Sequence, residues 1–275
     1  MSNSEEQVES VGGLKIFVRS WLPEGKPRAL VVIVPGFNSH GGQYVDVATL
    51  LAAKGLAVYT LDLRGRGRSD GERFYVESFA DYVADVHTVV TLAKSRLPGL
   101  KTFLLGHSAG GVVSCGYTLD HQSELAGLIC ESFAFQVPAP DFALAVIKGI
   151  SHLAPHAHVL RLKNEDFSRD PAQVAALNAD PLIAHETQPT KTVAEMVRAD
   201  ERLKRDFPLI KLPVFILHGS LDKATKPSGS QLFYEKVGAS DKTLKIYEGY
   251  YHDLLHDVGK EVVMADVEAW LDQRI

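Results

Sequence analysis

Short apolar segments recur along most of this chain, and an amphipathic or polar stretch separates each from the next. The clearest of them, residues 29–34, is apolar at every position. An unbroken run of this length is typical of a β-strand that is buried on both faces of a sheet. The pattern predicts strands, the first near a sheet edge, at residues 14–19, 29–34, 57–61, 102–105, 125–130, 213–218 and 244–247.

Amphipathic helices are predicted between these strands. Apolar residues recur at helical spacing over residues 79–97, which a proline and a glycine then end. Further helices are expected over residues 44–54, 111–119 and 262–274. Because strands and helices alternate, the predicted fold class is α/β, with a mostly parallel sheet that helices cover on both faces.

The alternation stops over residues 135–206, where prolines separate helical patches and no strand is expected. The strongest patches are residues 142–153 and 193–204. We interpret the region as a helical lid inserted into a core formed by residues 1–134 and 207–275. Its position suits a lid over the carboxyl ends of the strands, where open α/β sheets bind ligands. The alternative is an ordinary packing subdomain, in which the apolar residues of the first patch face the core.

The most informative motif follows the predicted strand at residues 102–105. The segment Gly106-His107-Ser108-Ala109-Gly110 places a serine between two glycines, at the turn from a strand into a helix. Such a turn strains the serine backbone, and small residues on either side let the flanking chains pass. The serine is presented above the start of a helix, where the helix potential favours a developing negative charge. We therefore predict Ser108 as a catalytic nucleophile.

A serine hydroxyl needs a neighbouring base to take its proton, and that base needs an acid to hold it in one tautomer. Each is expected just after a later strand. Asp222 directly follows the strand at residues 213–218 and is the predicted acid. Asp241 lies before a strand, and Asp62 belongs to a run that resembles a structural turn. The two remaining candidates adjoin the base and are expected at the surface: Asp253 and Asp257.

His252 is the predicted base, because it follows the last predicted strand and precedes the final helix. His256, four residues later, is the alternative. His107, next to the nucleophile, is expected to be a buried support of the turn. Three further histidines have a spacing that a metal site could use, but no cysteine or carboxylate cluster adjoins them, so we interpret them as lid surface: His152, His156 and His158.

Acyl transfer passes through a tetrahedral oxyanion, which two backbone N–H groups stabilise. Ala109, directly after the nucleophile, is expected to supply one of them. The loop after residues 29–34 begins Pro35-Gly36-Phe37, and Phe37 is expected to supply the other. Gly36 lets this loop turn tightly, and the ring of Phe37 is placed to wall an acyl pocket.

Composition narrows the function further. A net charge of −5 and an isoelectric point near 6.1 argue against nucleic acid as the main partner. No apolar stretch reaches membrane-spanning length, and the polar, acidic start is unlike a signal peptide. Cys115 and Cys130 are expected to be small buried residues rather than a secretory disulfide. These features fit a soluble cytoplasmic enzyme whose chemistry needs no metal and no organic cofactor.

Five segments spread over nearly the whole chain carry a resemblance to a known family. They have the sequences PGFNSH, DLRGRGRSDG, GHSAGG, HGSLD and YH, at residues 35–40, 62–71, 106–111, 218–222 and 251–252. With them the chain resembles the α/β-hydrolase superfamily. The resemblance is to the branch of monoacylglycerol lipases and lysophospholipases, known broadly as serine aminopeptidase-like hydrolases.

The resemblance implies an eight-stranded, mostly parallel sheet with an inserted helical lid whose apolar face receives an acyl chain. It implies Ser108, Asp222 and His252 as the catalytic triad, and the N–H groups of Phe37 and Ala109 as the oxyanion hole. The implied substrate is a monoacylglycerol or a similar monoester of a medium- or long-chain fatty acid. Apolar residues of the lid would also allow a transient contact with a membrane surface.

The chain departs from the family pattern at two positions. Pro35 stands where the family usually has histidine, and Ala109 stands where it often has methionine, which leaves the acyl pocket roomier. Lysophospholipids, small esters, lactones or N-terminal peptides are alternative substrates of the same triad. A ligand-binding protein that lacks turnover is the non-enzymatic alternative, because the fold alone does not secure an activity.

Overall fold

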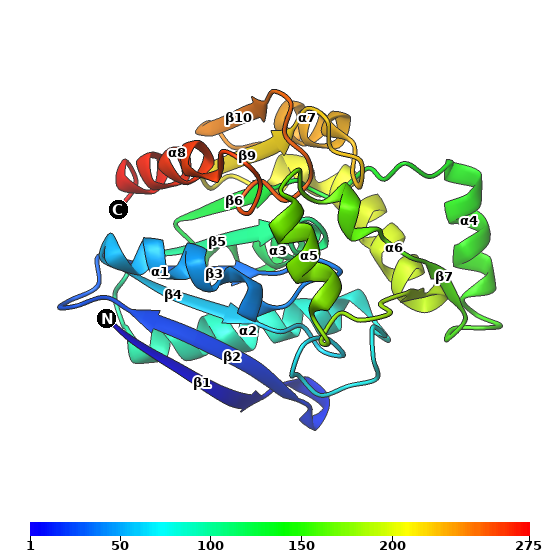
Figure 1. The fold of residues 1–275 in the computed structure, drawn as a ribbon, viewed down its shortest axis with the longest axis horizontal. Helices are drawn as coiled ribbons and strands as arrows, with labels where there is room; N and C mark the ends of the chain where they lie inside the picture. The colour runs from blue at the N-terminus through cyan, green and yellow to red at the C-terminus, as the bar shows by residue number, and fades with distance from the viewer.

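The computed structural model describes residues 1–275, apart from the side chain of Asp141. Its central sheet has eight strands (Figure 1). They are β1 (Ser2–Glu9), β2 (Lys15–Leu22), β3 (Ala29–Val34), β4 (Leu56–Leu61), β5 (Thr102–His107), β6 (Gly127–Glu131), β9 (Val214–Gly219) and β10 (Lys242–Tyr247). Their order in the sheet is β1-β2-β4-β3-β5-β6-β9-β10. The pairings of β1 with β2 and of β2 with β4 are antiparallel, whereas all the others are parallel, so the predicted fold class is confirmed.

Helices cover both faces of this sheet. The α-helices of the described chain are α1 (Val45–Ala53), α2 (Phe79–Arg96), α3 (Ala109–His121), α4 (Asp141–Ile150), α5 (Pro171–Ala179), α6 (Thr190–Asp206), α7 (Pro227–Lys236) and α8 (Lys260–Asp272). In β3, Leu30 and Val32 pack on the face with α2, α3 and α7, and Val31 and Ile33 pack on the face with α1 and α8. Successive side chains of a strand point to opposite faces, which is why β3 needs apolar residues at every position.

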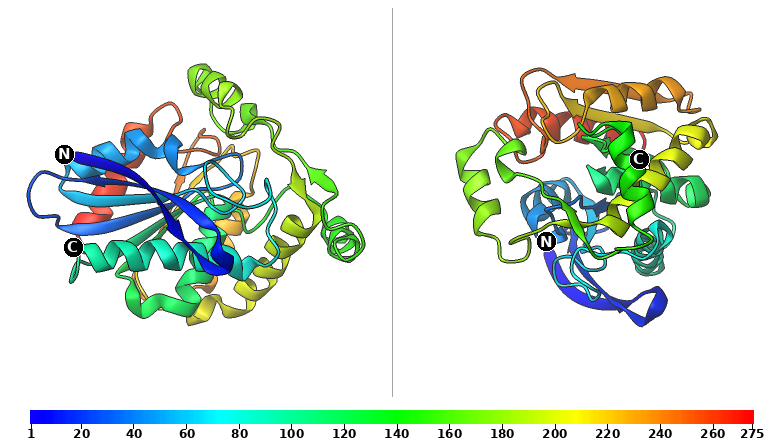
Figure 2. Two further views of the ribbon diagram at one scale, coloured as in Figure 1. Left: turned by 90° about the horizontal axis from the view of Figure 1, so that it is seen from below. Right: turned by 90° about the vertical axis from the view of Figure 1, so that its right-hand side faces the viewer.

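A mainly helical insert, residues 135–206, lies between β6 and β9. It contains α4, α5 and α6, and two short strands, β7 (His158–Leu160) and β8 (Gln188–Pro189), which pair antiparallel. The expectation that this region holds no strand is therefore wrong. The two strands are too short to leave an apolar pattern, and β7 is exposed throughout. Within the insert α6 packs on α3, and α4 packs on α6 at the outer edge of the molecule (Figures 1 and 2).

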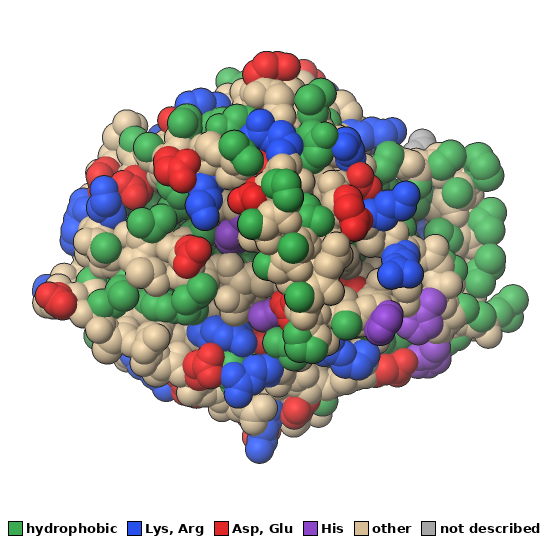
Figure 3. All heavy atoms as spheres, in the orientation of Figure 1, with side chains coloured by type: hydrophobic (Ala, Val, Ile, Leu, Met, Phe, Trp, Pro, Cys, Tyr) green, Lys and Arg blue, Asp and Glu red, His purple; other side chains and the backbone are tan. Residues whose placement is uncertain are grey.

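Helix α4 and the turn after it present apolar side chains to solvent. Phe142 is 72% exposed, Val146 54%, Ile150 42% and Leu153 90%. Figure 3 shows hydrophobic side chains gathered at the edge of the molecule that α4 forms. The alternative that the apolar residues of this predicted helix all face the core is thus wrong for Phe142, Val146 and Ile150. We call the four exposed side chains the α4 apolar patch.

The structure also adds elements at the chain's periphery. Strand β1 lies outside the predicted edge strand and pairs with β2 along its whole length. Its polar and acidic sequence gave no apolar signal, because an edge strand with exposed side chains needs none.

Cys115 and Cys130 are buried as predicted. Of the helices that the structure describes, none combines the length and the apolar character needed to cross a membrane.

Candidate active site

Ser108 occupies the sharp turn between β5 and α3. Its backbone has φ 54° and ψ −121°, a conformation that residues other than glycine rarely adopt. Glycine is needed on both sides of it. A Cβ on Gly106 would lie 2.6 Å from the carbonyl oxygen of Gly110, and one on Gly110 would lie 2.1 Å from that of Val34. The strand, turn and helix that the motif requires are therefore all present.

The carboxylate of Asp222 lies in the loop after β9 and is surrounded by donors. Its Oδ2 accepts hydrogen bonds from Nδ1 of His252 and Oγ1 of Thr225, both at 2.7 Å, and lies 3.0 Å from Nε2 of His218. Its Oδ1 accepts from the backbone N–H groups of Ala224 and Thr225. Burial by itself would raise the pKa of Asp222, but the two histidines outweigh burial and hold that pKa well below its usual value. Asp222 is thus an ionised, fixed acceptor.

The ring of His252 is buried between two aromatic neighbours. The rings of His107 and Phe167 each lie with their centroids 5.0 Å from it. Because a carboxylate only accepts hydrogen bonds, Nδ1 of His252 carries the proton in its pair with the acid, which leaves Nε2 of the neutral ring as an acceptor. The alternative base, His256, instead donates to Asp253 at 2.8 Å. The geometry therefore favours His252 over His256.

No hydrogen bond joins Ser108 to His252 among the contacts of the described residues, in which Nδ1 of His252 bonds Asp222. Catalytic hydrogen bonds of this kind are often long without substrate and tighten in the complex. The structure thus contains the hydrogen bond between His252 and Asp222. It does not contain the hydrogen bond between His252 and Ser108.

Ser108 lines a mostly apolar cavity of about 630 Å³ between the core and the insert. Apolar side chains of the insert cover it, among them Leu144, Ile147, Leu162, Val193 and Met196. Asp200 of α6 also lines this cavity, and its buried Oδ1 has no hydrogen-bond partner among the described residues. Burial raises the pKa of Asp200 well above its usual value, which favours the neutral acid.

The two predicted oxyanion donors lie beside Ser108 and also line the cavity. They are carried by the start of α3 and by the loop after β3, residues 35–43, which we call the oxyanion loop. Gly36 lies so close that a Cβ on it would be 2.8 Å from the Cβ of Ser108. Among the described groups, none accepts a hydrogen bond from the backbone N–H of Phe37 or of Ala109. Both N–H groups are thus available to an oxygen atom bound at Ser108.

Buried charges lie behind the Ser108 turn. His107 forms a hydrogen bond to Glu131 at the end of β6, and Glu131 also accepts the backbone N–H of Leu254 at 2.7 Å. Burial by itself would lower the pKa of His107, but Glu131 outweighs it and raises that pKa to about 9, with smaller contributions from Asp253 and Asp222. His107 is therefore a buried support of the turn, as predicted, and it carries a positive charge at neutral pH.

Two acids expected at the surface are buried instead. Asp253 pairs with His256, whose charge outweighs burial and lowers the pKa of Asp253 to about 2. Asp257 accepts hydrogen bonds from Arg169 and from the hydroxyl of Ser168. The sequence next to the predicted base does not show whether an acid there lies at the surface or is buried beside partners that neutralise its charge.

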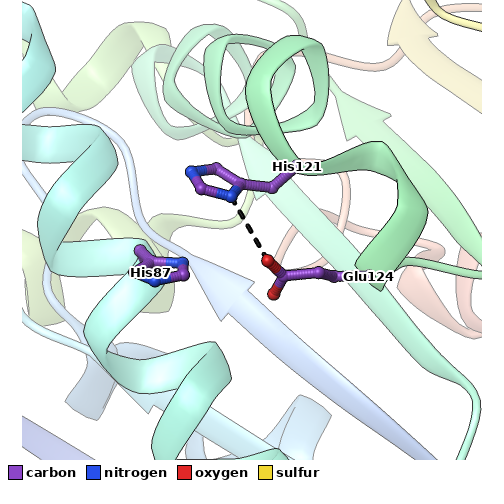
Figure 4. A group of neighbouring side chains, drawn as sticks. All are labelled: His87, His121 and Glu124. Carbon is purple, nitrogen blue, oxygen red and sulfur yellow. Dashed lines mark hydrogen bonds and ion pairs between the residues drawn. The ribbon is translucent and has the colours of Figure 1, made fainter.

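Among the described side chains, two groups have the composition of a metal site. The first combines His87, His121 and Glu124, whose ligand atoms all lie within 4.8 Å of one another (Figure 4). The imidazole rings of His87 and His121 stack at 4.5 Å with planes 21° apart, so their in-plane lone pairs do not converge on one ion. The second group is His107, Glu131 and Asp253, in which Glu131 already pairs with His107, and Asp253 pairs with His256 outside the group.

The histidines of the insert that were interpreted as surface lie apart from these groups. His156 contacts Glu72, and His158 contacts Thr187. His152 contacts Arg198. Each has a separate partner.

Residues 25–259 match the sequence profile of a family described as serine aminopeptidase, S33. The chain belongs to this family. The predicted resemblance to α/β-hydrolases of the monoacylglycerol lipase branch is thereby confirmed.

Relatives of this S33 chain include a monoacylglycerol lipase from Mycolicibacterium smegmatis, 33% identical over 274 residues, which are 98% of this chain and 97% of that protein. A monoglyceride lipase from Homo sapiens is 33% identical over 95% of this chain and 88% of its own length. The crystal structure of a Paleococcus ferrophilus monoacylglycerol lipase superposes with a TM-score of 0.85 at 28% identity. It covers 94% of this chain and 99% of that chain.

Sequence reasoning missed two polar residues of the S33 site. His218 was predicted as the end of a strand and as the first residue of the segment HGSLD, but without a role of its own, although it stands four residues before Asp222 and contacts the oxygen that His252 contacts. Thr225 gave no signal, because a hydroxyl three residues after an acid is common in turns. A histidine at the end of a buried strand was the one local cue, since a buried imidazole needs a partner.

Proposed function

We propose that this S33 protein hydrolyses monoacylglycerols of medium- or long-chain fatty acids to glycerol and fatty acid through an acyl-enzyme on Ser108. It is a carboxylic ester hydrolase. The observation that carries the proposal is the apolar cavity of about 630 Å³ that opens onto Ser108. A cavity of this size and lining suits an acyl chain. The relatives named as monoacylglycerol lipases support this choice of ester.

In the proposed mechanism Oγ of Ser108 attacks the ester carbonyl carbon while Nε2 of His252 takes the hydroxyl proton. Asp222 stabilises the resulting imidazolium and keeps its tautomer. The N–H groups of Phe37 and Ala109 stabilise the oxyanion. The tetrahedral intermediate then expels the glycerol oxygen, which takes the proton from His252.

The second half of the cycle repeats the first with water. His252 takes a proton from a water molecule, whose oxygen attacks the acyl carbon. The tetrahedral intermediate releases the fatty acid, and Oγ of Ser108 regains its proton from His252. The charge and hydrogen bonds around Asp222 support this role, because they keep the carboxylate ionised.

The insert, residues 135–206, acts in this proposal as a lid over the cavity, and the core consists of residues 1–134 and 207–275. Side chains of the insert supply much of the apolar lining of the cavity. The α4 apolar patch is then the surface that meets aggregated lipid, because exposed apolar side chains on one face of a helix gain free energy in the acyl region of a lipid surface.

The activity test uses a fluorophosphonate probe and monoacylglycerols of graded acyl length. Wild-type protein is expected to be labelled and to hydrolyse them, and Ser108→Ala is expected to lose both properties. Retained hydrolysis in Ser108→Ala would overturn the nucleophile, and faster hydrolysis of aminoacyl amides than of lipid esters would overturn the substrate.

The lipid-surface contact is tested by sedimentation with phosphatidylcholine vesicles that contain monoacylglycerol. The double variant F142S/L153S is expected to bind them at least about fivefold more weakly, since two large apolar side chains leave the surface. Val262→Ser is the matched control, because Val262 is 54% exposed on α8. Equal binding by the double variant and the wild type would remove this contact from the proposal.

A further inference from the structure

The oxyanion loop is held from outside the core by side chains of the insert, and one of them, Glu186, contacts its backbone. Glu186, in the turn before β8, accepts the backbone N–H of Asn38 on its Oε1 at 2.9 Å. Asn38 has φ 51°, in the left-handed region that non-glycine residues rarely occupy. Such a backbone persists only when its surroundings hold it in place. The loop therefore depends on a contact with a residue 148 positions later in the chain.

Glu186 is itself fixed by two further donors. Its Oε1 accepts from Nε2 of Gln188 at 2.7 Å and from the guanidinium of Arg66. The side chains of Glu186 and Arg66 are each only 1% exposed. Burial by itself would lower the pKa of Arg66, but Glu186 and Tyr82 outweigh it and raise that pKa, so Arg66 is a buried cation with Glu186 as its ion-pair partner.

Arg66 extends the same support to the neighbouring residue of the loop. Its guanidinium carbon lies 4.0 Å from the centre of the Phe37 ring, and its second nitrogen donates to Gln188 at 2.7 Å. Glu186 thus holds the Asn38 backbone while its ion-pair partner packs on the Phe37 side chain. Together the two contacts hold the N–H of the peptide unit that joins Phe37 to Asn38, and the side chain of Phe37.

We propose that Glu186 is a positioning residue for the oxyanion hole. The peptide between Phe37 and Asn38 is planar, so a fixed N–H on Asn38 fixes the plane of this peptide and limits the orientations that the preceding peptide, which carries the N–H of Phe37, can adopt. The N–H of Phe37 then stays directed at the oxygen that forms on a substrate bound to Ser108. This inference rests on the proposed function, in which Phe37 supplies an oxyanion donor.

The same contact couples the oxyanion loop to the seating of the insert. A second residue of the insert, Asp180, accepts from Nε2 of His40 at 2.9 Å and from Gln43 at 3.1 Å, both on the oxyanion loop. A third residue of the insert, Asn164, accepts from Nδ2 of Asn38 at 3.0 Å. Withdrawal of the insert would therefore free the loop from all three residues. The donor geometry is therefore complete only when the insert is seated on the core.

Two conservative variants of Glu186 test whether it positions the oxyanion loop or only stabilises the fold. Glu186→Asp keeps the charge that Arg66 needs, but its shorter side chain cannot reach both Arg66 and Asn38. Glu186→Gln keeps the oxygen that Asn38 needs and removes the charge. Its amide nitrogen would take the place of Oε2, which has no hydrogen-bond partner among the described residues.

The readouts are kcat and KM on a short soluble ester, the rate of fluorophosphonate labelling, and the melting temperature. For Glu186→Asp we expect kcat and labelling to fall roughly 10- to 100-fold, less than the 10²–10³ of losing a donor outright. KM should change less than about threefold, because Glu186 does not line the substrate cavity. For Glu186→Gln we expect near-normal kcat and a lower melting temperature.

Thr192→Val is the matched control. Thr192 is a buried residue of α6 that joins the insert to the core through the N–H of Val76 and the carbonyl of Phe74. Its loss should lower the melting temperature and leave kcat unchanged.

The inference is overturned if kcat follows the melting temperature across all three variants, or if Glu186→Asp keeps normal kcat and labelling. Wild-type protein that the probe does not label would overturn the proposed function together with it. If the probe labels the wild-type protein but the protein does not hydrolyse monoacylglycerols, only the proposed substrate is overturned. The Glu186 comparison still stands, because it uses a soluble ester.

Discussion

His218 and His252 direct their imidazoles at the same oxygen atom, Oδ2 of Asp222, from 3.0 and 2.7 Å. The two rings have different surroundings. His252 belongs to the loop after β10, whereas His218 is the penultimate residue of β9 and is completely buried. Nδ1 of His218 contacts the hydroxyl of Ser230 at 2.7 Å, so that hydroxyl can donate to Nδ1 while Nε2 donates to Asp222. His218 therefore orients the acid that orients the base.

Replacing His218 should weaken catalysis without removing any atom that contacts substrate. In His218→Leu the buried oxygen of Asp222 loses a donor, which costs on the order of 1–3 kcal/mol of stability. We expect kcat to fall roughly tenfold, since the acid holds His252 less firmly. His218→Gln, whose amide can donate to the same oxygen, should recover part of both losses. Steady-state kinetics and thermal unfolding check this, and an unchanged kcat in His218→Leu would contradict it.

Asp222→Asn should retain the fold and lose most of the activity. An amide can donate to Nδ1 of His252, which would move the proton to Nε2 and leave no acceptor for the hydroxyl of Ser108. Comparable changes in Ser-His-Asp enzymes cost about 10⁴ in kcat. The measurement is kcat on a soluble ester, beside circular dichroism of the variant. Activity within tenfold of the wild type would mean that another group orients His252.

Stability should fall as pH rises from about 6.5 to 9, because of His107. The pKa of His107 is raised from 6.5 to about 9 in the folded protein. A raised pKa contributes stability that is complete below the unfolded value and is lost as pH rises through the folded one. The difference corresponds to about 3 kcal/mol. Urea unfolding of the wild type and of Glu131→Gln tests this, since the variant should be less stable and show a flatter pH dependence. Parallel curves for the two proteins would assign the loss to other groups.

Gly110 and Gly149 should respond in opposite ways to alanine. A Cβ on Gly110 would lie 2.1 Å from the carbonyl oxygen of Val34 and 2.5 Å from that of Pro35, and neither backbone atom can move aside easily. We expect Gly110→Ala to lose on the order of 3 kcal/mol or more, or to fail to fold. Gly149, in α4, has no atom within 4 Å of such a Cβ, so Gly149→Ala should gain up to about 1 kcal/mol. Denaturant titrations of both variants decide the matter, and a tolerated Gly110→Ala would show that the turn can open.

Asp200→Leu should increase both stability and the preference for long acyl chains. The change removes a carboxyl whose buried Oδ1 has no partner among the described residues, and such a group costs about 1–3 kcal/mol. It also makes the lining of the cavity more apolar. We expect the ratio of kcat/KM for long-chain over short-chain esters to rise roughly threefold to tenfold. Asp200→Asn, which stays polar, is the control. A ratio that falls in Asp200→Leu would indicate that the acid binds part of the substrate.

The turn that carries Ser108 could be predicted, because the residues that specify it lie within a few positions of it in the sequence. The turn at Ser108 is specified by its own glycines and by the strand and helix beside it, whose positions the apolar pattern reveals. Parallel strands end at the same edge of a sheet, so an acid and a histidine after later strands were expected near that edge. The pairing of Asp222 with His252 follows from this topology.

The remaining features were decided by the tertiary structure. The sequence determined the α/β fold and the order of serine, acid and base, because strand and helix periodicity and turn residues act over a few positions. The partners of Asn38 and His107, in the insert and in a neighbouring strand, lie many residues away, and no local pattern marks them. Helical spacing also reads the same whether an apolar face is covered or exposed, so only packing could reveal that α4 turns Phe142 and Val146 to solvent.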